Sequence, residues 1–237
     1  MSIIDYKNAL NDYEDDLEIN NGEYSYEKHL EIFREHHPCY GYAVNSVNDE
    51  NVPKYVKKQC VEFLDGLERD GDEDYKYFFD LDVADNITDL LHLINFSSGV
   101  KSGTAVVYGL AGFQWFMILN TLCWYRKSNP EKRRYEKSVL LIGRKSGKSF
   151  MVGLIFILLL LLEPRYSEFY SVAPDRQLSS IVKKEAEQLI SVSPFLSDRF
   201  KVRRTDVECK VTNSTFTPLA LSNHRMDGRR ASVFVAD

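Results

Sequence analysis

Apolar residues in the first hundred positions recur at spacings of three and four, which places them on one face of a helix. Residues 26–36, 52–67 and 81–96 all show this pattern. We therefore predict a helix over each of these three ranges. The stretch up to Gly22 is polar and acidic, and its pattern leaves open a short helix or a loose arm.

Beyond about residue 110, short apolar runs alternate with helical stretches. Helices are predicted over residues 112–125, 150–162 and 177–190, with a basic polar loop over 126–137. Strands are predicted at residues 138–142, 168–172, 201–211, 215–221 and 231–236. This alternation indicates an α/β fold whose parallel sheet carries helices on both faces.

The helix predicted over 150–162 is almost wholly apolar. Its apolar run is shorter than the roughly 20 residues that a membrane span needs, so we interpret it as a core helix. The composition agrees with a globular chain, since hydrophobic residues are 44% and charged residues 27% of the 237 positions.

Cysteine usage and the N-terminus narrow the class of protein. The four cysteines are scattered and form no C-x-x-C pair, which argues against a disulfide scaffold and a thiolate zinc site. The first ten residues lack the basic and apolar regions of a signal peptide. We expect a reduced, intracellular protein.

Charge is divided unevenly along the chain. Residues 1–100 carry a balance of −15 and residues 101–237 a balance of +10, which together give the formal net charge of −5. The basic part could contact a polyanion, or the two parts could neutralise each other. A linker-like stretch, residues 97–103, coincides with the charge change. We predict an acidic helical region over 1–100 and a second domain over 101–237.

The most specific motif is the run Gly143-Arg144-Lys145-Ser146-Gly147-Lys148-Ser149, between a predicted strand and a predicted helix. In this setting backbone N–H groups and the helix dipole bind phosphate. Lys148 would reach the β- and γ-phosphates, the Ser149 hydroxyl would bind Mg²⁺, and Gly147 would allow close approach of the backbone. The motif departs from the general P-loop pattern at Ile142, where a glycine is usual.

A second motif is the apolar strand 233–236, which ends in Asp237. This is the Walker B pattern, in which the aspartate holds Mg²⁺ through water. In NTPases that activate a water molecule, a glutamate general base commonly comes next. No residue follows Asp237 in this sequence, which puts independent hydrolysis by the chain in question.

Together these residues resemble the large terminase subunit of tailed double-stranded DNA phages, in the branch whose phosphate loop is of the R-K-N-G-K-S type. That branch also lacks the first Walker A glycine. The segment Leu110–Trp115 is similar to the family's L-x-x-[FW]-Q element, in which the glutamine, here Gln114, contacts adenine. Residues 173–177 and the run from Leu221 to Gly228 resemble blocks that precede Walker B.

The resemblance implies a P-loop NTPase domain of the additional-strand, RecA-like type that binds ATP and Mg²⁺. Gln114 and residues 143–149 would bind the nucleotide, Arg144 and Lys148 would act in catalysis, and Ser149 and Asp237 would hold Mg²⁺. The family's C-terminal nuclease of the RNase H-like fold has no counterpart in the sequence up to Asp237.

The resemblance also implies a role and partners. The activity would be translocation of double-stranded DNA into a procapsid. The partners would be a small terminase subunit, a portal protein and further copies in a homo-oligomeric ring, in the host cytoplasm and not in a membrane. Two alternatives stay open: another P-loop DNA translocase or helicase-like ATPase, and an inactive truncated terminase remnant.

Overall fold

The computed structural model describes residues 1–20, 22–174, 176–220 and 231–236. Its contacts divide the chain into two compact units that alternate along the sequence. The first unit comprises residues 1–86 and 110–139, and the second comprises 87–109 and 140–237. The predicted division into domains 1–100 and 101–237 stays a prediction.

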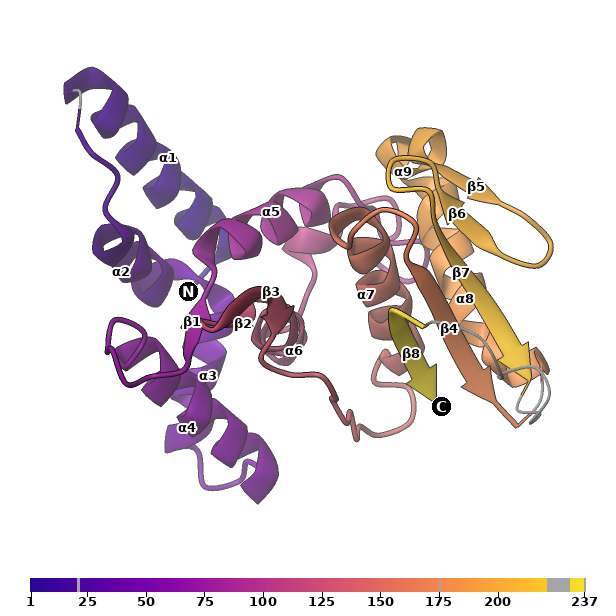
Figure 1. The fold of residues 1–237 in the computed structure, drawn as a ribbon, viewed down its shortest axis with the longest axis horizontal. Helices are drawn as coiled ribbons and strands as arrows, with labels where there is room; N and C mark the ends of the chain where they lie inside the picture. The colour runs from indigo at the N-terminus through magenta and orange to yellow at the C-terminus, as the bar shows by residue number, and fades with distance from the viewer. Residues whose placement is uncertain (21, 175, 221–230, 237) are drawn as a thin grey trace. The chain divides into compact units, whose positions relative to one another are not determined.

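The first unit is mainly helical and contains a small antiparallel sheet (Figure 1). Its helices are α1 (Ile3–Asn20), α2 (Tyr26–His36), α3 (Pro38–Asn48), α4 (Lys54–Glu68) and α6 (Gly112–Leu122). Its sheet has the order β1 (Tyr77–Phe79), β2 (Trp124–Arg126) and β3 (Asn129–Arg133). Helix α5 (Leu81–His92) begins in this unit and ends in the second. The helices predicted over 26–36 and 52–67 are confirmed as α2 and α4, and the acidic N-terminal stretch forms the helix α1.

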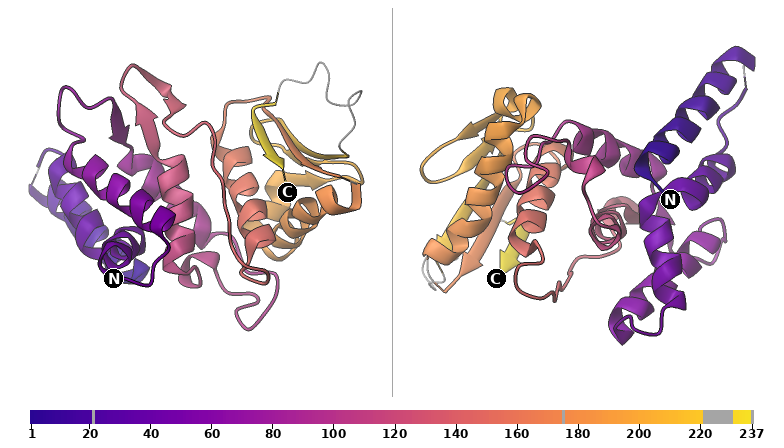
Figure 2. Two further views of the ribbon diagram at one scale, coloured as in Figure 1. Left: turned by 90° about the horizontal axis from the view of Figure 1, so that it is seen from below. Right: turned by 180° about the vertical axis from the view of Figure 1, so that it is seen from behind.

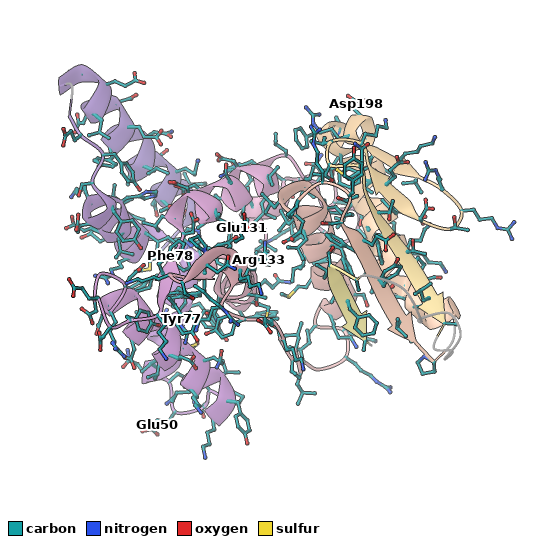
Figure 3. The ribbon with its side chains drawn as sticks, viewed as in Figure 1. Glu50, Tyr77, Phe78, Glu131, Arg133 and Asp198 are labelled. Carbon is teal, nitrogen blue, oxygen red and sulfur yellow. The ribbon has the colours of Figure 1, made fainter. Side chains whose placement is uncertain are left out.

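Two predictions for residues 112–137 need correction. The helix predicted over 112–125 ends at Leu122, because Trp124 enters β2 and pairs with Phe79. The loop predicted over 126–137 contains β3, most of which is exposed. Backbone pairing with β2 and the Arg133 guanidinium, which donates to the carbonyl of Leu122 at 3.1 Å, hold this strand. Figure 3 labels Tyr77, Phe78 and Arg133 at the small sheet. Because β3 is held through backbone groups and is mostly exposed, its sequence does not alternate between apolar and polar residues, and the pattern gives no sign of a strand.

The join between α2 and α3 shows how local polar groups end one helix and start the next. The Ser25 hydroxyl caps α2 by accepting from the N–H of Lys28 at 3.3 Å. His37 ends α2 and caps α3, where its Nδ1 accepts from the N–H of Cys39 at 3.0 Å. Burial lowers the pKa of His37 to about 3, so the ring is a neutral cap at physiological pH.

Asp70 ties α2 to β1 in the first unit. It is 7% exposed, and its Oδ2 accepts from the Tyr26 hydroxyl at 2.5 Å and from the N–H of Phe79 at 2.9 Å. Burial, followed by the hydrogen bond to Asp70, raises the pKa of Tyr26 well above its ordinary value. The carboxylate therefore satisfies two groups in a largely dry environment.

Replacing Asp70 by alanine is expected to lower the free energy of unfolding by about 1–3 kcal/mol, because the buried N–H of Phe79 loses its acceptor. A urea titration would measure the change. The matched control is Asp74→Ala, which removes a carboxylate that is 80% exposed and pairs with Arg69 at 3.5 Å. That change is expected to cost under about 0.5 kcal/mol. Equal losses in the two variants would contradict the role of Asp70.

The second unit contains a five-stranded mixed sheet of order β5-β6-β7-β4-β8 (Figure 1). The strands are β4 (Glu168–Ala173), β5 (Phe200–Val202), β6 (Val207–Cys209), β7 (Ser214–Ala220) and β8 (Val233–Ala236). Strands β7, β4 and β8 are mutually parallel, while β5, β6 and β7 pair antiparallel. The helices are α7 (Lys148–Leu162), α8 (Arg176–Val192), α9 (Pro194–Arg199) and the short 3-10 helix η1 (Val106–Tyr108). The single strand predicted over 201–211 is the hairpin β5–β6.

Helices α7 and α8 lie on the same face of this sheet, as the rear view in Figure 2 also shows. Phe156 of α7 contacts Phe169 of β4, and Ser171 of β4 donates to the carbonyl of Ser179 in α8 at 2.9 Å. Alternate residues of a strand share a face, so both helices pack on the side of Phe169 and Ser171. The prediction had helices on both faces. Connecting helices move to the other face of such a sheet at the point where the strand order changes direction. Here the chain goes from β7, on one side of β4, to β8, on the other side, so a helix on the second face would belong to the β7–β8 connection. Residues 221–230, which connect them, lie outside the described residues.

The strand predicted at 138–142 does not form. This segment pairs with no strand in the described parts of the chain, and Val139 and Leu141 are each 94% exposed. An apolar β-branched run becomes a strand only where a neighbour supplies a hydrogen-bonding edge. The helix predicted over 81–96 also ends early, at His92. In the described parts of the chain, no helix is long and apolar enough to cross a membrane.

Candidate nucleotide-binding site

The candidate site is the phosphate loop, defined here as residues 143–149, in the second unit. Positions 143–146 are exposed and α7 begins at Lys148. Gly147 caps the helix with φ 78° and ψ 21°, a left-handed conformation that glycine adopts without cost. Lys145 also has a left-handed φ, of 64°. For a residue with a side chain this conformation costs about 1 kcal/mol, and such positions cluster at functional sites.

The start of α7 is suited to an anion. No side-chain hydrogen bond from the described residues caps it, and its first turn carries no acidic residue. The first N–H groups of a helix have no partner within the helix, and the dipole adds partial positive charge there. Lys148 and Ser149 occupy the first turn and are half-buried, while Arg144 is exposed on the loop. The structure therefore gathers the predicted residues 143–149 around one helix start.

The two remaining predicted site residues, Gln114 and Asp237, are distant from the phosphate loop in the sequence. Gln114 is at the third position of α6, in the first unit, and its Oε1 accepts from the N–H of Ala111 at 2.8 Å. This contact is one half of a capping box, since alanine offers no side-chain acceptor in return. Asp237 lies outside the described residues. The strand before it, β8, is parallel to β4, with Val172 opposite Ala236.

Sequence reasoning missed Gly153, which positions α7. A Cβ atom there would meet Glu185 Cβ at 3.0 Å and the backbone nitrogen of Ala186 at 3.3 Å, both on α8. The glycine thus allows the helix that carries Lys148 to approach the backbone of α8. The available signal was a single glycine within a run of large apolar residues, which commonly marks a close helix approach.

Comparison with known proteins identifies the family. The model of the family "Terminase large subunit, ATPase domain" matches residues 112–237, which is more than half of the chain. No curated protein matches. Among solved structures, the crystal structure of the HK97 bacteriophage large terminase is similar, with a TM-score of 0.50 at 16% sequence identity. The match covers 65% of this chain and 30% of that one, and at this identity it shows a likeness of mixed α/β fold alone. On the strength of the family match, the chain belongs to the terminase large subunit ATPase domain family.

Proposed function

We propose that the phosphate loop binds ATP with Mg²⁺, and that the chain is the ATPase portion of a motor that drives double-stranded DNA into a phage procapsid. One observation carries this proposal: Lys145 and Gly147 are left-handed directly before a helix that has no side-chain cap and whose first turn holds Lys148 and Ser149. This arrangement offers consecutive N–H groups and a cation to a polyphosphate. Membership of the terminase family supports the link to DNA packaging.

The magnesium ligands would be Ser149 and Asp237. Both supply hard oxygen donors of the kind that Mg²⁺ prefers, and the bound ion would neutralise charge on the β- and γ-phosphates. Ser149 lies in the first turn of α7. Asp237 follows β8, whose carboxyl end shares a sheet edge with that of its parallel neighbour β4. Ligands of α/β sheets bind at this edge, which supports the assignment.

Arg144 and Lys145 would add positive charge beside the phosphates. Both side chains belong to exposed residues of the loop. We assign to Arg144 the stabilisation of charge that develops on the transferred phosphoryl group, as an arginine supplied from within the chain. Lys145 would add electrostatic attraction, and its left-handed backbone would turn the loop around the phosphates.

Gln114 would recognise the adenine base. Because its Oε1 already accepts from Ala111, its Nε2 is the group left to donate to a ring nitrogen of the base. The expected consequence is a preference for ATP that depends on this donor. Gln114→Glu keeps the acceptor for Ala111 and removes the donor.

The partners follow from the family. Double-stranded DNA, a small terminase subunit, a portal protein and further copies in a ring are proposed, with the host cytoplasm as the place of action. The balance of +10 in residues 101–237 supports contact with a polyanion. The solved large terminase is much longer than this chain, so packaging is proposed for the whole protein.

The test is whether nucleotide and DNA binding are coupled. Fluorescence anisotropy of a labelled linear duplex, at one fixed salt concentration, would give the DNA affinity of the chain with and without Mg²⁺ and a slowly hydrolysed ATP analogue. We expect the affinity to change by about fivefold or more with nucleotide. Lys148→Ala should remove the difference. An unchanged DNA affinity would contradict a motor role and favour an inactive remnant.

A further inference from the structure

We propose that Phe96 is a positioning residue for the phosphate loop, acting through Phe150 at the start of α7. This inference rests on the proposed nucleotide site. The rings of Phe96 and Phe150 are stacked, with centroids 5.3 Å apart and an interplanar angle of 20°. Phe150 directly follows Ser149 in the first turn of α7, so its position is tied to that of the phosphate-binding residues.

The segment that carries Phe96 is anchored to α8. The backbone N–H of Asn95 donates to the hydroxyl of Ser193 at 2.8 Å, and its side-chain amide donates to the carbonyl of Val192 at 3.1 Å. Ser193 is fully buried. These bonds fix Asn95 at the carboxyl end of α8, and Phe96 comes next in the chain.

Hydrogen bonds within the segment hold it in a tight hairpin. Asn95 and Ala105 form an antiparallel bridge. The N–H of Phe96 donates to the carbonyl of Thr104, and the N–H of Gly103 donates to the carbonyl of Phe96, each at 2.9 Å. Both the N–H and the carbonyl of Phe96 are therefore hydrogen-bonded, which fixes the backbone from which its ring projects.

Gly109 also lies against the ring of Phe96. A Cβ atom on Gly109 would lie 2.2 Å from Cε2 and 2.7 Å from Cζ of Phe96, closer than real atoms approach. Only a glycine fits against the ring at this distance. The Phe96 ring thus contacts Phe150 and lies close to the backbone of Gly109, so a side chain at Gly109 would displace it.

The contact matters because Gly147, the residue that caps α7, has no side chain that could hold the first turn. Within the described residues no side-chain hydrogen bond caps this helix. A first turn without a side-chain cap frays more readily, and packing of a side chain within it helps to order it. Phe150 is such a side chain, and the anchored Phe96 is the surface against which it packs.

Two variants disturb this contact in different ways. Phe96→Ala removes the ring, and Gly109→Ala keeps the ring but forces it to move. In each folded variant we expect the affinity for Mg·ATP to fall by about fivefold or more relative to the natural sequence. Phe96→Leu keeps apolar volume but removes the ring stack. Its affinity for Mg·ATP is expected to lie between those of Phe96→Ala and the natural sequence.

The controls separate positioning from general destabilisation. Phe195→Ala removes a half-buried ring of the same unit, on α9, which packs under the guanidinium of Arg199 at 3.9 Å. Gly71→Ala adds a methyl group where nothing lies within 4 Å. Phe195→Ala should lower the unfolding temperature and leave nucleotide affinity unchanged, and Gly71→Ala should alter neither.

Isothermal titration below the unfolding temperature would measure these affinities, with circular dichroism to establish the folded fraction. Weakened binding in both Phe96→Ala and Gly109→Ala, with normal binding in Phe195→Ala, is the expected result. Normal affinity in a folded Phe96→Ala or Gly109→Ala would overturn the positioning role. Absence of ATP binding by the natural sequence would instead overturn the proposed function, so the two failures are distinguishable. If Phe96→Ala does not fold, Phe96→Leu and Gly109→Ala decide.

Discussion

Replacing Lys148 by alanine is expected to weaken ATP binding by about 30-fold or more, which corresponds to about 2 kcal/mol. The ammonium group would be the cation closest to the β- and γ-phosphates, and it acts together with the N–H groups at the start of α7. Without it, the helix start still offers amides and dipole, so the variant should retain weak binding. Isothermal titration with ATP and Mg²⁺ would measure the change.

The matched control for this prediction is Lys201→Ala. Lys201 carries the same charge in the same unit but is exposed on β5, at an edge of the sheet. Its removal lowers the net charge equally, so a general electrostatic effect would appear in both variants. A Lys148→Ala variant that binds ATP as tightly as Lys201→Ala would rule out the assigned role of Lys148.

The second large effect concerns stability. Phe216→Ala is expected to lower the free energy of unfolding by about 3–5 kcal/mol. Phe216 is fully buried in β7, and its ring is stacked on Phe156 of α7 with centroids 4.4 Å apart and 16° between the planes. Its register partner on β4 is Phe169, which also contacts Phe156. The substitution would leave a cavity between the sheet and α7.

Phe234→Ala is the control for this change, because Phe234 lies on β8 of the same sheet but is 46% exposed. Its loss is expected to cost under about 1.5 kcal/mol, since less apolar surface is uncovered. Chemical denaturation of both variants would give the comparison. If Phe216→Ala cost no more than Phe234→Ala, the aromatic stack between α7 and the sheet would not be the core of this unit.

Helices with strong periodicity could be predicted from the sequence, because burial of one face leaves a direct trace in the residue pattern. Residues 26–36, observed as α2, are an example. The run 150–162, observed as α7, could be predicted from its length and uniform apolarity instead. Strand β3 could not be found in this way, since its residues are mostly exposed and its pairing with β2 depends on backbone groups. The segment 138–142 shows the reverse, an apolar run with no paired edge among the described residues.

The phosphate loop could be predicted because all its groups are neighbours in the sequence and the chemistry depends on their spacing. The residues that position it could not. Gly153 matters through a helix–helix approach to Glu185, and Phe96 through a ring far away in the sequence, Phe150. Such contacts depend on the tertiary arrangement. The lone glycine in the apolar run 150–162 is a local sign of a close approach, but it does not identify the partner.

The most direct test of the account is to locate the bound nucleotide by NMR. A slowly hydrolysed ATP analogue with Mg²⁺ would be titrated into the isotopically labelled chain while backbone amide shifts are followed. If the nucleotide binds at the phosphate loop, saturable shifts will be largest in residues 143–149 and in the first turn of α7. Saturable shifts centred elsewhere, or no saturable shift in the phosphate loop, would contradict it.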